Sequence, residues 1–119
     1  MLTEDWMMRQ VEALARSIAY LVFQKQTTEY TPTGAEEDAE IDALHRRLLE
    51  KIEAGDLCGA EDLLFTESDL DDRRYLELAV DFYTRLNDLT DEQLSRADFG
   101  RDEIQEGLRN LAGQFGVSL

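Results

Sequence analysis

Histidine, cysteine and carboxylate side chains are the groups of this chain that could carry catalysis or metal binding. Of the 119 residues, 27 are aspartate or glutamate, one is histidine (His45) and one is cysteine (Cys58). His45 and Cys58 are thirteen residues apart on what we predict to be neighbouring helices, so a Cys–His pair is geometrically conceivable. A lone cysteine usually acts as a small buried hydrophobe. We therefore expect a buried Cys58, and a His45 at the surface or at a helix cap.

Metal sites need more ligands than this pattern supplies. A di-metal carboxylate centre in a helical bundle requires Glu-x-x-His pairs on facing helices, whereas the residue three before His45 is Asp42. An EF-hand loop starting at Asp69 would need glycine at its sixth position and glutamate at its twelfth, where the chain has Arg74 and Val80. The sequence predicts no metal site, no cofactor and no catalytic residue.

The alternative function is a small carboxylate-based enzyme, either metal-dependent or hydrolytic. In that reading, His45 or pairs of carboxylates would serve as the acid–base groups. The favoured reading is that the chain is not an enzyme, because no nucleophile, phosphate-binding or dinucleotide motif occurs in it.

Negative charge dominates the composition and is unevenly distributed. The formal net charge is −15, but residues 1–34 hold four acids against three bases, so nearly all of the excess lies beyond them. A surface this acidic repels phosphate backbones and anionic lipid headgroups, which excludes nucleic-acid and membrane-surface binding. If the acidic part binds a protein, we expect that partner to present a basic patch.

Apolar residues recur at helical spacing through most of the chain, and no segment alternates with the period of a strand. Gly55 follows one such stripe and is a natural helix stop. Thr90 with Gln93, and Thr33 with Glu36, have the spacing of capping boxes at helix starts. The stripes begin and end as follows: Met7–Leu21, Ile41–Ile52, Leu57–Leu64, Tyr75–Leu86 and Ile104–Phe115.

These signals predict an all-α fold of five to six helices, with a long N-terminal helix and antiparallel helical hairpins. We expect a single domain over residues 1–119. Within it, residues 1–26 form an arm helix, 27–34 a linker around the only proline, and 35–119 an acidic helical body.

Residues 48–64 carry the most recognisable local pattern, a Gly-Asp-apolar turn followed by a small residue and two leucines. This pattern resembles the turn between the two helices of a tetratricopeptide repeat. The resemblance implies repeat-like packing, in which Ala60 lets the two helices approach closely. The alternative is an ordinary antiparallel hairpin with a glycine stop and an aspartate cap.

Two further stretches, residues 5–21 and 98–108, are similar to the opening and closing helices of a family of short, uncharacterised proteins from Gram-positive bacteria. That family is a domain of unknown function. The resemblance spans nearly the whole chain and implies a helical protein, with no activity and no site residues to carry over.

The arm helix is apolar on more than one side, so it must be buried on more than one side. Either the body wraps it as a central helix, or it packs against a partner, most simply a second copy in a two-fold dimer. We therefore predict a protein-interaction module that self-associates or binds a protein partner through this helix. The predicted contact residues are Trp6, Met7, Met8, Val11, Leu14, Ala15, Ile18, Leu21 and Val22.

Compartment follows from cysteine usage and from the absence of apolar runs. One cysteine cannot form a disulfide within the chain, which fits a reducing environment. The first residues carry acids where a secretory signal has bases. The longest apolar run, residues 18–23, is far shorter than the roughly 20 residues of a bilayer span. We expect a cytoplasmic protein.

Overall fold

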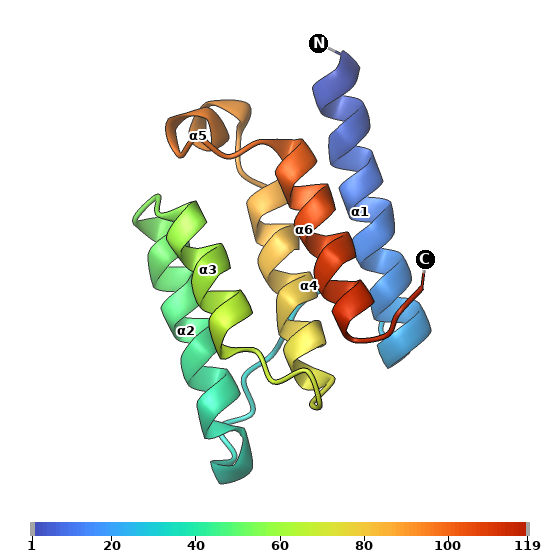
Figure 1. The fold of residues 1–119 in the computed structure, drawn as a ribbon, viewed down its shortest axis with the longest axis vertical. Coiled ribbons are helices and arrows are strands. Elements are labelled where there is room, and N and C mark those ends of the chain that lie inside the picture. The colour runs from blue at the N-terminus through green and yellow to red at the C-terminus, as the bar shows by residue number, and fades with distance from the viewer. Residues whose placement is uncertain (1, 119) are drawn as a thin grey trace.

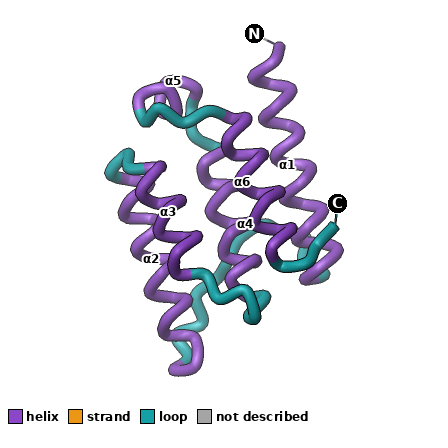
Figure 2. The backbone as a smooth tube through the Cα atoms, viewed as in Figure 1, coloured by secondary structure: helices purple, strands orange, loops and turns teal. Residues whose placement is uncertain are grey.

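Six α-helices and one short 3₁₀ helix make up the computed structural model, which describes residues 2–118 (Figure 1). The described residues contain no strand, so the predicted all-α fold of five to six helices is confirmed (Figure 2). In chain order the elements are α1 (Leu2–Phe23), η1 (Glu36–Asp38), α2 (Ala39–Glu53), α3 (Leu57–Glu67), α4 (Arg74–Asn87), α5 (Asp91–Arg96) and α6 (Arg101–Gln114).

Helix α4 is the centre of the fold. It packs against α1, α2 and α6, and ten of its fourteen residues are buried. Only one side, with Arg74, Glu77, Thr84 and Arg85, is partly exposed, as expected for a helix covered by neighbours over most of its circumference. The sequence suggested α1 as a candidate central helix, but the structure assigns that place to α4.

Helices α2 and α3 form an antiparallel hairpin that packs on α4 through α2 (Figure 1). Gly55 ends α2 with a φ of +81°, a conformation that glycine adopts without steric cost. The Asp56 carboxylate then accepts a hydrogen bond from the Gly59 amide and caps α3. Ala60 is fully buried. The tetratricopeptide-like character of the hairpin stays a prediction.

Local sequence signals determine the first residue of some helices but not of others. Thr90 and Gln93 form the predicted capping box at α5. The predicted box of Thr33 with Glu36 is wrong, because the Thr33 hydroxyl donates to Asp38 instead. The Asp38 carboxylate also accepts a hydrogen bond from the Arg74 guanidinium on α4. A contact between distant parts of the chain, not the local box, therefore determines where η1 begins.

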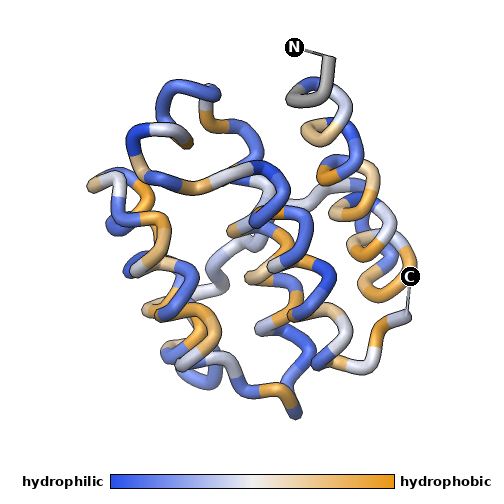
Figure 3. The backbone as a smooth tube through the Cα atoms, turned by 45° about the horizontal axis from the view of Figure 1, so that its top comes forward, coloured by the Kyte–Doolittle hydropathy of each residue, from blue (hydrophilic) through white to orange (hydrophobic). Residues whose placement is uncertain are grey.

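The predicted arm helix lies alongside the body rather than apart from it. Helix α1 packs on α4 and α6, and apolar residues recur along its whole length (Figure 3). The connection to α2 is not helical from Gln24 to Ala35, four residues more than the predicted linker of 27–34. Its middle is fixed rather than loose, because Tyr30 is buried in the core.

Candidate interaction surface

Helix α1 presents two faces of opposite character. Its inner face is buried against the body and consists of Val11, Leu14, Ala15, Ile18 and Ala19. On its other side, Trp6, Tyr20 and Leu21 have relative exposures of 58%, 61% and 63%. We define the outer face of α1 as its exposed residues from position 5 onward, which are Asp5, Trp6, Arg9, Ala13, Arg16, Ser17, Tyr20 and Leu21.

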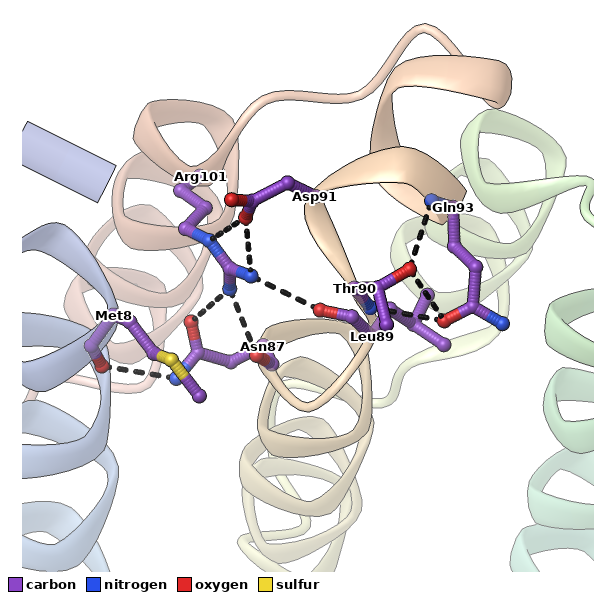
Figure 4. Close-up of polar contacts among 7 residues, drawn as sticks. All are labelled: Met8, Asn87, Leu89, Thr90, Asp91, Gln93 and Arg101. Carbon is purple, nitrogen blue, oxygen red and sulfur yellow. Dashed lines mark hydrogen bonds and ion pairs between the residues drawn. The ribbon is translucent and has the colours of Figure 1, made fainter. Parts of the chain in front are cut away.

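Asn87, at the end of α4, fixes the first part of α1. Its side-chain amide donates to the carbonyl of Met8 over 2.9 Å, while its side-chain oxygen accepts from Arg101 over 3.1 Å (Figure 4). These two bonds fix the orientation of the amide, because the nitrogen must face Met8 and the oxygen must face the guanidinium. Asn87 is almost fully buried.

Arg101 supports Asn87 from the first turn of α6. Its guanidinium donates to the main-chain carbonyl of Asn87 over 2.8 Å, to that of Leu89 over 3.0 Å and to the Asp91 carboxylate over 2.9 Å. A buried cation at the carbonyl end of α4 also complements that helix dipole. The chain Asp91–Arg101–Asn87–Met8 thus joins four helices, α5, α6, α4 and α1 (Figure 4).

The other end of α1 is fixed by a polar network around Asp81. The Asp81 carboxylate, nearly buried on α4, accepts from the Tyr30 amide over 3.1 Å and from Arg85 Nε over 2.7 Å. His45 Nδ1 lies 3.8 Å from the same carboxylate, and its ring packs on Tyr30 with centroids 5.2 Å apart. Since α1 leads directly into this linker, the network holds its C-terminal end in place.

His45 makes stability depend on pH. Burial lowers its pKa below the ordinary value, although Asp81 opposes that effect; Arg85 lowers the pKa further and Asp42 raises it. The unfolded chain therefore binds a proton near pH 6.5 that the folded protein resists. We expect the free energy of unfolding to be steady above about pH 6.5 and to fall as the pH decreases below it. Urea titrations from pH 7.5 to 5 measure this slope.

The control for this prediction is His45→Gln, which removes the only histidine. The variant should be less sensitive to pH in the same window, so the difference between the two slopes isolates the imidazole. Equal slopes in the parent and the variant would show that burial of His45 has no part in acid sensitivity.

Five acids of the body line a cleft of about 530 Å³ between α3 and α6. It is lined by Cys58, Glu61, Asp62, Phe65, Phe99, Asp102, Glu103, Glu106, Gly107 and Asn110. Burial raises the pKa of Glu61, the Tyr83 hydroxyl opposes this by donating to it over 2.6 Å, and neighbouring carboxylates add to the rise. Desolvation raises the pKa of the Cys58 thiol, and the negative charges of the neighbouring carboxylates raise it further.

A model of the Family of unknown function (DUF6483) matches residues 1–116. The chain belongs to this family. The resemblance seen in residues 5–21 and 98–108 is thus confirmed at the level of a family of unknown function. No curated protein and no solved structure matches the chain.

Of the contact residues predicted from the sequence, the structure buries some and exposes others. Val11, Leu14, Ala15 and Ile18 are core residues, so they are not available to a partner. Trp6 and Leu21 are exposed. Met7, Met8 and Val22 are half-buried at the edges. Periodicity identified an apolar helix but not which side the body covers, and the exposed Ala13 and Tyr20 were missing from the predicted set.

Both expectations for the chemistry-bearing residues are corrected. His45 is buried, with 6% exposure, because Tyr30 covers it. Cys58 is exposed and lines the acidic cleft. The structure places the two at different sites and does not bring them together as a pair. Within residues 2–118, no group of three or more His, Cys, Asp or Glu side chains is arranged to hold a metal ion.

Among the residues that the structure describes, no helix is both long and apolar enough to cross a bilayer.

Proposed function

We propose that this family member is a non-enzymatic interaction module that contacts a protein through the outer face of α1. One observation carries the proposal. Of the five exposed large hydrophobic side chains in the described part of the chain, Trp6, Tyr20 and Leu21 lie on this one helix. The three side chains project from the same side of the helix, and tryptophan and tyrosine are enriched where proteins meet.

The rigid support of α1 favours this role. Asn87 and Arg101 hold its first part from the inside, and the Tyr30 linker holds its end. A surface fixed in this way loses little conformational freedom when a partner binds, so more of the contact energy is available for affinity.

The non-enzymatic part of the proposal is supported by the surroundings of the only histidine. An acid–base group must reach a substrate within hydrogen-bond distance, whereas His45 is covered by the Tyr30 ring and faces Asp81. We place the module in the cytoplasm, because its single cysteine suits a reducing compartment.

A partner that extends from α1 onto the acidic body is expected to be basic. The α3–α6 cleft is lined by five carboxylates and no lysine or arginine. Binding of such a partner should weaken as salt is added, because screening reduces the attraction.

Site-specific photo-crosslinking in cells that express the chain tests the proposed function. A photoreactive amino acid replaces Ser17 on the outer face of α1, and in a matched variant it replaces Ser95 on α5; both serines are exposed on helices. We expect discrete protein adducts, including any with a second copy of the chain, from position 17 and none of comparable yield from position 95. The absence of adducts at position 17, or equal yields at both positions, would refute the proposed contact surface.

A further inference from the structure

The aromatic residues of the outer face are arranged symmetrically about Ala13. Trp6 precedes Ala13 by seven residues and Tyr20 follows it by seven. Residues seven apart on an α-helix differ by only about 20° in direction, so all three lie in one row. Each aromatic side chain is about 10.5 Å along the axis from the alanine. The row therefore reads aromatic–small–aromatic in both directions.

This symmetry matches a second α1 crossing at Ala13 in the opposite direction. In that arrangement Trp6 of each copy lies opposite Tyr20 of the other, which forms two aromatic pairs related by a two-fold axis. A two-fold interface requires that one patch complement itself. The small side chain of Ala13 at the crossing point lets the two helices approach closely.

The charge on α1 distinguishes a second copy from other occupants. Each chain carries −15, so two copies repel one another over most of their surfaces. From residue 5 to residue 23, however, α1 holds two acids, Asp5 and Glu12, and two arginines, Arg9 and Arg16. The exposed charges on this side of α1 are Asp5, Arg9 and Arg16, and Arg16 pairs with the half-buried Glu12 at 4.0 Å. The outer face therefore offers little attraction to a basic protein, and it lacks the excess of acids through which two copies of the body repel each other.

We infer that the occupant of the outer face is a second copy of this chain, bound as an antiparallel two-fold dimer centred on Ala13. The inference rests on the proposed function and names its partner. Opposed helix directions also place the positive end of each helix dipole near the negative end of the other.

The area available sets the expected affinity. A fully buried aromatic side chain covers roughly 150–250 Å², and about three fifths of Trp6 and of Tyr20 is exposed before association. Four such side chains bury several hundred Å², which is below the roughly 1,200 Å² of stable interfaces. The dimer should therefore be weak, with a dissociation constant in the micromolar range.

Sedimentation equilibrium of the purified full chain tests the inference. From about 1 to about 500 µM, the mean mass should rise from 13.7 kDa towards twice that value. Ala13→Glu places two carboxylates face to face at the axis and should raise the dissociation constant about tenfold or more. Ala54→Glu, at the exposed alanine that directly follows α2, is the control and should leave the dissociation constant unchanged. A constant mass of one chain over the whole range would overturn the dimer.

The effect of salt on the dissociation constant of this dimer is opposite to its effect on binding to a basic partner. Because the contact is apolar and the two bodies repel, added salt should lower the dissociation constant. Binding through the acidic cleft to a basic partner would respond in the opposite way. A mass increase that disappears at high salt would contradict the proposed interface.

A mixing experiment tests the antiparallel orientation. Trp6→Glu and Tyr20→Lys should each weaken self-association. In an equimolar mixture, an antiparallel pair retains one Trp–Tyr contact and gains one ion pair, so the mixture should dimerise more strongly than either variant alone. A parallel pair gains neither, so a mixture no stronger than the single variants would overturn this orientation.

Failure of the dimer and failure of the proposed function give different results. A monomer in solution that still yields discrete adducts to another protein at position 17 refutes only the second copy as partner. A chain without adducts at position 17 refutes the contact surface itself.

Discussion

Arg101→Met should lower the free energy of unfolding by about 3 kcal/mol. The guanidinium is buried and bonds two main-chain carbonyls, the Asn87 side chain and Asp91. Methionine has a similar volume but no donor. Its presence would leave the carbonyls of Asn87 and Leu89 without these bonds in a buried region, and each lost partner costs about 1–3 kcal/mol. Urea denaturation of the parent and the variant measures the difference.

The same substitution should loosen the first part of α1. Without Arg101 the Asn87 amide can rotate, so its bond to the Met8 carbonyl is no longer enforced. Hydrogen exchange should therefore speed up in the first half of α1 more than in its second half, which the Tyr30 linker holds. Uniform acceleration along α1 would refute the idea that Asn87 fixes this part.

Arg96→Met is the matched control. Arg96 lies on α5 with 76% of its side chain exposed and pairs with Glu92, which is 72% exposed. Exposed pairs of this kind contribute about 0–1 kcal/mol. If both arginine variants lost the same free energy, the buried network around Arg101 would have no special role in stability.

Gly107→Ala should destabilise the protein by about 1–3 kcal/mol although alanine is the better helix former. A Cβ at this position would meet the Tyr83 hydroxyl at 2.6 Å, the ring carbon that bears it at 2.8 Å and Glu61 Oε2 at 2.5 Å. Glu61 can move into the cleft, but Tyr83 is fully buried. Forced displacement of a packed side chain typically costs this much.

Gly113→Ala, on the same helix, should have the opposite sign. Nothing lies within 4 Å of a Cβ built there, so the helix propensity of alanine should stabilise the protein by about 0.5–1 kcal/mol. Thermal or urea unfolding of the pair makes the comparison. Stabilisation by both alanines would mean that α3, α4 and α6 do not meet as closely at Gly107 as described.

The positions of the helices could be predicted from the sequence because they depend on local signals. The stop at Gly55 and the capping box of Thr90 with Gln93 involve residues close in the chain, and both occur as predicted. The start of η1 could not be predicted, because a long-range contact from Arg74 to Asp38 competes with the local capping box of Thr33 and Glu36.

The candidate interaction surface could be predicted only in part. Spacing identified α1 as unusually apolar, but the buried side of a helix is decided by what packs on it, here α4 and α6. The Asn87–Arg101 support joins residues on two helices to the Met8 carbonyl, and no sequence pattern marks such a contact. Burial of His45 likewise results from Tyr30 folding over it.

Quenching of Trp6 fluorescence by acrylamide tests the central claim most directly, because Trp6 is the only tryptophan and lies on the outer face of α1. In the purified full chain at about 1 µM, quenching should match that of an exposed indole. At several hundred micromolar it should fall markedly and the emission should shift to shorter wavelength, because a second α1 covers the ring. In Ala13→Glu neither change should occur. Quenching that stays the same at every concentration in the parent chain would contradict the account.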